Sequence, residues 1–160
     1  MLVAHRLPER RRQPSDMEIA GAPACILNLA RLLVRYFSGR PASFDILAIP
    51  MDRSGWTPFQ RGVAAALAAV PYGETRSYAE LAESAGYSRA WRAVGSFMAR
   101  NPFPVILPCH RIIKSNGGLG RFSAGAGWKK KLLELEGCLR QDRHQAGSRT
   151  SSLETNSTNE

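Results

Sequence analysis

The sequence has few cysteines and no long apolar run. Its three cysteines, Cys25, Cys109 and Cys138, are an odd number at wide spacing, which argues against a disulfide framework and against a zinc site. No apolar stretch is long enough to span a bilayer. The basic start, residues 1–13, lacks the apolar stretch and cleavage site of a signal peptide. We therefore expect a cytoplasmic protein with reduced thiols, no membrane attachment, no metal and no cofactor.

Acidic residues are scarce in one part of the chain. Residues 86–137 contain nine lysines and arginines against two acidic residues, whereas residues 1–85 contain ten against eight and residues 138–160 three against three. Most of the net charge of +9 therefore falls in one third of the sequence. Such a concentration is typical of a surface that binds a polyanion, although a solvated basic surface fits the charge equally well.

The two ends of the chain differ in composition from the middle. Residues 1–16 are expected to form a loose basic leader, and residues 139–160, rich in polar and charged side chains, a disordered tail. With 160 residues, of which 44% are hydrophobic, the chain suffices for one domain, alone or with a fragment of a second. After the leader, the pattern predicts a helix over residues 22–37 and a short strand over residues 43–49.

Capping motifs predict the helices of the middle region. Residues 57–60 and 77–80 are both capping boxes, and the helix that follows the second ends near Gly86. Ser88 is expected to cap a third helix over residues 89–100. Two helices joined by a short turn with glycine are typical of a helix-turn-helix, and the second of this pair is the more basic.

A proline-rich segment with the apolar run 105–107 leads to a candidate nucleophile, Cys109. We expect this segment to be extended and buried. A thiol attacks only as the thiolate, so it needs a base or positive surroundings. His110 is adjacent, but neighbouring side chains of an extended strand point to opposite faces, so a bridging water or a bent backbone would be needed. A glycine-rich loop, 117–127, then precedes a last predicted helix, 128–136.

Residues 101–113, with the sequence NPFPVILPCHRII, closely resemble the active-site signature of the O6-alkylguanine-DNA alkyltransferases. Further motifs of that family recur in the same order: PYGETRSY at 71–78, RAVG at 92–95 and LEG at 135–137. The resemblance extends from about Phe44 to Gly137.

The resemblance implies an α+β fold in two unequal parts. A mainly helical C-terminal domain, residues 55–138, would carry the helix-turn-helix, the DNA-binding surface and the active site. Residues 17–54 would be a truncated remnant of the family's N-terminal α/β domain, without the zinc ligands that some members hold there.

The resemblance also implies DNA repair in a single turnover. Cys109 would irreversibly take the alkyl group from O6 of a guanine that has been flipped out of the duplex. His110 matches the general base that reaches the thiol through a water, and Glu136 the carboxylate that orients this histidine. Asn101 matches the residue that braces the turn carrying the cysteine. Tyr78 matches the tyrosine that helps to rotate the nucleotide and hydrogen-bonds the departing base.

Other matched positions imply contacts with DNA or with the flipped base. Arg92 matches the arginine that enters the duplex where the base used to be, and the Ile112 carbonyl would accept a hydrogen bond from the guanine amino group. The remaining expected binding residues are Met98, Phe122, Ser123 near the guanine oxygen, Ser77 and Lys129. The expected partner is double-stranded DNA carrying O6-alkylguanine, bound in the minor groove by a monomer, with alkylthymine open as a second substrate.

One residue of the predicted second helix departs from the family pattern. Trp91 stands where a small residue usually faces the groove, and it could block close approach, wedge into the DNA or stack on it. The alternative function is a non-enzymatic helix-turn-helix protein that senses lesions or regulates transcription. The presence of Cys109 argues against the sensor.

Overall fold

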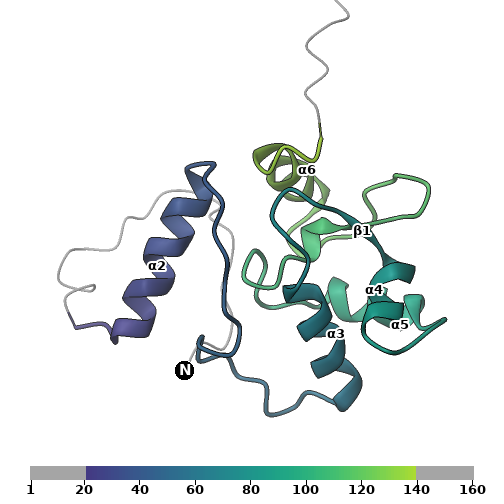
Figure 1. Cartoon of the computed structure of the whole chain (residues 1–160), viewed down its shortest axis with the longest axis horizontal. Helices are drawn as coiled ribbons and strands as arrows, with labels where there is room; N and C mark the ends of the chain where they lie inside the picture. The colour runs from purple at the N-terminus through teal and green to yellow at the C-terminus, as the bar shows by residue number, and fades with distance from the viewer. Residues whose placement is uncertain (1–20, 140–160) are drawn as a thin grey trace, which may run out of the picture.

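The computed structural model describes residues 21–139 (Figure 1). The predicted leader, 1–16, and all of the predicted tail beyond residue 139 lie outside the described residues. The described elements are α2 (Ala24–Phe37), α3 (Pro58–Ala68), β1 (Arg76–Ser77), α4 (Tyr78–Ser84), α5 (Trp91–Ala99), the 3₁₀ turn η1 (Cys109–Arg111), β2 (Ile112–Ile113) and α6 (Ala126–Leu135). This mainly helical chain with one small sheet confirms the α+β prediction. No helix of residues 21–139 is both long and apolar enough to cross a membrane.

The small sheet brings two distant segments together. Strands β1 and β2 are parallel, with Arg76 opposite Ile112 and Ser77 opposite Ile113. Parallel strands need a long connection, which here contains α4, α5 and η1. The sheet thereby places the start of α4 beside the segment that follows Cys109.

Local hydrogen bonds fix the starts of α3 and α4. The Thr57 and Ser77 hydroxyls each accept a hydrogen bond from the backbone N–H three residues on, and the Gln60 and Glu80 side chains accept from the capping residues' own N–H groups. Both predicted capping boxes are therefore confirmed. Helices α4 and α5 pack against each other, as a helix-turn-helix requires.

The predicted cap of the third helix is wrong. Helix α5 begins at Trp91, two residues later than predicted, and its N-cap residue, Ala90, makes no side-chain hydrogen bond. Arg89 has a positive φ of 70°, which prevents a helix from starting directly after Ser88.

The predicted strand over residues 43–49 is also wrong, because the chain makes a turn there. The Asp45 carboxylate accepts hydrogen bonds from the backbone N–H groups of Leu47 at 2.8 Å and Ala48 at 3.4 Å. The N–H of Ile49 donates to the Asp45 carbonyl at 3.1 Å. A short acidic side chain that satisfies nearby N–H groups in this way offers the backbone an alternative to pairing in a sheet.

Helix α2 joins the main core through two buried side chains, Leu29 and Tyr36. Figure 1 shows α2 at one side of the molecule, with the segment after it running between α2 and helix α3. Tyr36 near the end of α2 is fully buried and packs edge-on against Phe44 and Tyr72. Because these side chains belong to one continuous hydrophobic cluster, residues 21–54 and the rest of the described chain share a core.

Candidate active site

A tight turn, and not the predicted extended segment, delivers Cys109. Val105 has a positive φ of 74°, and the N–H of Leu107 donates to the Phe103 carbonyl at 2.9 Å. Asn101 braces the turn, since its side-chain oxygen accepts from the Phe103 N–H at 2.9 Å and its amide nitrogen donates to the Leu107 carbonyl at 3.0 Å. The apolar run is buried, as predicted, but the backbone is bent, and Cys109 begins a 3₁₀ turn.

The thiol of Cys109 is almost completely buried. Its Sγ accepts a hydrogen bond from the Asn101 amide nitrogen at 2.9 Å. Burial raises the pKa of Cys109 to about 11, although the bond from Asn101 and the positive charge of Lys129 act in the opposite direction. The sulfur is therefore a thiol at neutral pH, and a base must remove its proton before it can attack an electrophile.

The side chain next in sequence can act as that base. His110 is fully buried, and its Nε2 lies 2.7 Å from Glu136 Oε1. Burial lowers the pKa of His110, although Glu136 opposes this effect. The imidazole is therefore neutral at neutral pH. Its other nitrogen, Nδ1, is buried without a hydrogen-bond partner among the described residues, so it is the ring atom open to a proton.

Glu136, at the C-terminal end of α6, is a buried carboxylate that accepts five hydrogen bonds. Oε1 accepts from His110, from Tyr36 at 2.7 Å and from Arg111 at 3.0 Å. Oε2 accepts from Arg111 at 2.8 Å and from the Gly73 N–H at 3.2 Å. Burial by itself would raise the pKa of Glu136, but the bonds from His110, Arg111 and Tyr36 lower it to about 2.

Two members of this cluster were missed in the sequence analysis. Arg111 pairs with Glu136 and also donates to the Val70 carbonyl at 2.6 Å. Its position directly after the Cys-His pair is a signal that could have identified it, because a buried carboxylate needs a cation. Tyr36 lies 100 residues before Glu136 and carries no such signal.

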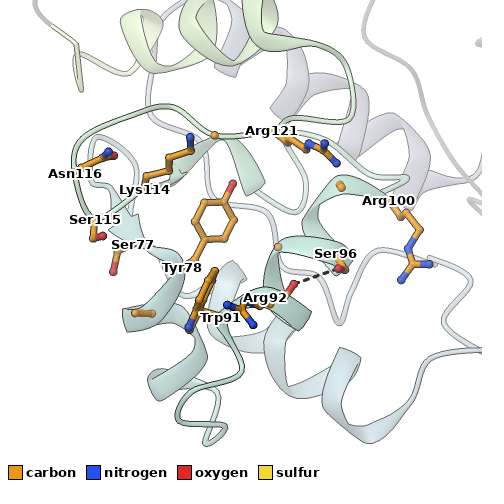
Figure 2. Close-up of a pocket in the computed structure, with 14 residues that line it drawn as sticks. Ser77, Tyr78, Trp91, Arg92, Ser96, Arg100, Lys114, Ser115, Asn116 and Arg121 are labelled. Atoms are coloured by element: carbon orange, nitrogen blue, oxygen red, sulfur yellow. Dashed lines mark hydrogen bonds between the residues drawn. The ribbon is translucent and has the colours of Figure 1, made fainter.

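A basic cleft of about 1080 Å³ is lined by the start of α4, by α5 and by the loop that follows β2 (Figure 2). Its lining residues are Ser77, Tyr78, Ala79, Trp91, Arg92, Gly95, Ser96, Ala99, Arg100, Lys114, Ser115, Asn116, Gly120 and Arg121. The lining contains three arginines and one lysine but no acidic residue, so the cleft attracts anions. Cys109 does not line it.

Tyr78 lines the basic cleft and lies near Cys109. Figure 2 shows its ring in the middle of the cleft with the hydroxyl directed at the loop that carries Gly120. Burial and the nearby Cys109 raise the pKa of Tyr78, so its hydroxyl remains a proton donor. Gly120 has a φ of +72°, and a Cβ there would lie 2.7 Å from the tyrosine oxygen. A glycine is therefore required at this close approach.

Several predicted binding residues lie away from the cleft. Met98 and Phe122 are buried in the core, Phe122 with its ring edge-on to His110 at 6.4 Å, and Ser123 is exposed outside the cleft. Lys129 is also fully buried, and it donates to the carbonyl of Ile112, the group predicted to bind the guanine amino group. The hydrogen bond to that carbonyl holds the Lys129 ammonium in the interior and not at the surface. There its positive charge acts on the thiol of Cys109. Of the predicted binding residues, Ser77, Tyr78 and Arg92 line the cleft.

Trp91 and Arg92 form a pair at the start of α5. The Trp91 side chain is 47% exposed, and the Arg92 guanidinium lies 4.8 Å from the centre of its ring. This cation–π contact holds the arginine at the mouth of the cleft. Trp91 therefore fixes the position of its neighbour.

Comparisons with known proteins identify the family of this chain. The family model for the DNA-binding domain of 6-O-methylguanine DNA methyltransferase matches residues 58–138, which include the helix-turn-helix, Cys109, His110 and Glu136. The chain belongs to this methyltransferase family.

Curated members of the family have similar sequences. The methylated-DNA–protein-cysteine methyltransferase of Methanosarcina barkeri is 49% identical over 107 residues, which are 67% of this chain and 65% of that protein. The protein of the same name from Mycobacterium tuberculosis is 40% identical over 136 residues, 85% of this chain and 80% of that protein. The chain thus spans between about two thirds and four fifths of these two relatives.

Solved structures of family members have the same fold. The crystal structure of the Mycobacterium tuberculosis O6-methylguanine methyltransferase matches with a TM-score of 0.65 at 39% identity, covering 84% of this chain and 79% of that one. A crystal structure of the Mycobacterium tuberculosis protein in complex with DNA matches with a TM-score of 0.62 at 43% identity, covering 68% of this chain and 64% of that one.

Proposed function

We propose that this methyltransferase-family protein repairs DNA by transferring the alkyl group of O6-alkylguanine to Cys109. The observation that carries the proposal is the buried thiol followed directly by a neutral histidine that is hydrogen-bonded to a carboxylate, all beside a basic cleft. The relatives named methylated-DNA–protein-cysteine methyltransferases support it. Because the target is DNA, we place the protein in the cytoplasm.

The proposed reaction needs one base and one nucleophile. His110 Nδ1 takes the thiol proton through a bridging water, and the imidazolium that forms is stabilised by Glu136. The thiolate attacks the alkyl carbon, a sulfur–carbon bond forms and the carbon–O6 bond breaks. The proton removed from the thiol is returned to guanine, so the products are an S-alkyl cysteine and an unmodified base. Lys129 is fully buried beside Cys109, and burial lowers its pKa to about 8; its ammonium supplies positive charge to the thiolate.

The basic cleft is the proposed DNA-facing surface. Three of its cations, Arg100, Lys114 and Arg121, contact backbone phosphates, which fixes the register of the duplex without reading sequence. The target base must leave the stack to reach a sulfur that is buried and does not line the cleft. The tyrosine hydroxyl, which keeps its proton, donates a hydrogen bond to the departing base. The complex with DNA of the Mycobacterium tuberculosis relative supports this assignment.

Replacing Arg92 by alanine should impair repair of duplex DNA much more than reaction with a free alkylated guanine base. We propose that Arg92, which contacts the Trp91 ring, fills the space left by the flipped base. Arg92 is therefore needed only when the base stack of a duplex must be kept open. The measurement is the single-turnover rate on both substrates. Arg53→Ala, which changes an arginine outside the cleft lining, is the control. Equal losses on both substrates in Arg92→Ala would contradict the assignment.

The experiment that tests the proposed function is a titration of excess alkylated duplex against a fixed amount of protein. An S-alkyl cysteine is a thioether, and neither His110 nor Glu136 provides a way to cleave it. Repair should therefore stop at one equivalent, and the intact protein should gain the mass of one alkyl group on Cys109. Repair beyond one equivalent would contradict the single-use mechanism. The alkylated protein should also melt at a lower temperature, because an added group in a packed site typically costs about 1–3 kcal/mol.

A further inference from the structure

We propose that Tyr36, from the N-terminal helix α2, is a positioning residue for the reaction, because it sets the charge that Glu136 presents to His110. The proposal rests on the proposed function of Cys109 and His110. It makes α2 a part of the reactive site and not only a remnant that covers the core.

The contacts of Tyr36 are specific to the His–Glu pair. Its ring is fully buried, its hydroxyl donates to Glu136 Oε1 at 2.7 Å, and the same oxygen lies 3.2 Å from His110 Nε2. Among the described residues of the N-terminal segment, 21–54, it is the one that hydrogen-bonds this pair. A tyrosine that only filled space would not need a hydroxyl aimed at a buried carboxylate.

These contacts fix which nitrogen of His110 is basic. Glu136 Oε1 can only accept a hydrogen bond, and the tyrosine oxygen has already given its proton to that carboxylate. The His110 proton must therefore lie on Nε2, between two acceptors. Nδ1 keeps its lone pair and is the atom that can receive the proton of Cys109.

The Tyr36 hydroxyl also limits how far the Glu136 carboxylate raises the pKa of His110. Glu136 raises the pKa of His110, and Tyr36 is one of the donors that neutralise part of the Glu136 charge. Without this donor the carboxylate would hold the imidazolium more strongly. His110 would then titrate at higher pH and be less available as a base near neutrality. The contact between the tyrosine oxygen and Nε2 acts in the opposite direction, but at 3.2 Å it is longer than the 2.7 Å bond from the hydroxyl to Glu136, so the effect on the carboxylate is the larger one.

Other titratable and charged groups surround the pair on several elements. They are Tyr72 from the loop after α3, Cys109 and Arg111 from η1, Lys129 from α6 and Cys138 after α6. None of them donates a hydroxyl proton to Glu136, so the effect of Tyr36 can be isolated by removing one oxygen atom.

The test compares Tyr36→Phe with Tyr72→Phe. Tyr72 is the matched control, because its ring lies 6.0 Å from that of Tyr36, but its hydroxyl donates to the Leu135 carbonyl at 3.0 Å and not to the carboxylate. We expect Tyr36→Phe to slow transfer from a free alkylated base about tenfold at neutral pH, as for the loss of a hydrogen bond to a charged group. The acid limb of its pH–rate profile should move to higher pH, and the His110 midpoint in a histidine NMR titration should move with it. Tyr72→Phe should change neither.

Wild-type protein in the same assay separates the two proposals. If the wild type gains no alkyl mass on Cys109, the proposed function fails, but the NMR titration still tests Tyr36. If the wild type reacts and Tyr36→Phe keeps its rate, pH profile and His110 midpoint, the role of Tyr36 is refuted alone. If Tyr36→Phe does not fold, the NMR spectrum of the wild-type protein tests the role of Tyr36. A protected hydroxyl proton with contacts to the Tyr36 ring is expected in its NMR spectrum, and the absence of that signal would overturn the proposal.

Discussion

Replacing Cys109 by alanine is expected to abolish alkyl transfer completely while DNA binding stays near the wild-type level. The sulfur is the only proposed acceptor, and the residues that line the basic cleft do not include it. The measurements are the intact mass after incubation with alkylated duplex and the affinity for the same duplex at one salt concentration. Affinity should fall with rising salt for both proteins, as it does for contacts dominated by phosphates.

The two other cysteines supply matched controls for this variant. Cys25 is exposed on α2 and Cys138 is partly buried after α6. Cys25→Ala and Cys138→Ala should both still gain one alkyl group. Dealkylation of DNA by Cys109→Ala would show that the nucleophile has been assigned wrongly. A large loss of DNA binding in that variant would show that the cysteine turn also shapes the cleft.

Replacing Glu136 by alanine should have the largest effect on stability. Glu136 neutralises the buried guanidinium of Arg111 and accepts hydrogen bonds from Tyr36 and His110, so its removal leaves all three without their partner. Breaking a buried ion pair on one side typically costs about 3–5 kcal/mol, much of the stability of an ordinary domain. The free energy of unfolding from denaturant titration is the measurement, and transfer should be strongly slowed in any protein that still folds.

Glu134 is the matched control, because it is a neighbouring glutamate on the same helix. Among residues 21–139, Glu134 pairs with Lys130 at 3.7 Å near the surface, and such pairs contribute about 0–1 kcal/mol. Glu134→Ala should therefore fold and react almost normally. If Glu136→Ala were no less stable than Glu134→Ala, the buried cluster would not hold the helix end to the active site as we describe.

The same carboxylate predicts how stability depends on pH. The pKa of Glu136 is lowered from 4.5 in the unfolded chain to about 2 in the fold, so its contribution to stability is fully present above pH 4.5. It is lost as the pH falls from 4.5 through about 2, because the unfolded chain then binds the proton more readily. In the wild type this loss should be evident as acid unfolding, and Glu136→Gln should flatten the curve in that range.

The sequence by itself determined the starts of α3 and α4 and the reactive pair. The capping boxes at Thr57 and Ser77 involve residues only three positions apart, so their hydrogen bonds can form wherever the chain turns into a helix. Cys109 and His110 are adjacent, and the surrounding signature indicated their chemistry. The prediction from the local pattern was wrong where hydrogen bonds of a short polar side chain favoured a turn over a strand. At residues 43–49 the Asp45 carboxylate satisfied the backbone and formed a turn in place of a strand.

Only the tertiary structure decided what surrounds these residues. Glu136 could have been an exposed residue at a helix end, and it is instead the centre of a buried cluster that draws on α2, η1 and the loop after α3. Lys129 was predicted to bind DNA or the flipped base, and it is instead buried against the Ile112 carbonyl beside the thiol. Tyr36 reaches the site across 100 residues of chain. Burial and hydrogen bonding at such separations arise from packing, which no local pattern contains, and packing sets the pKa values on which the chemistry depends.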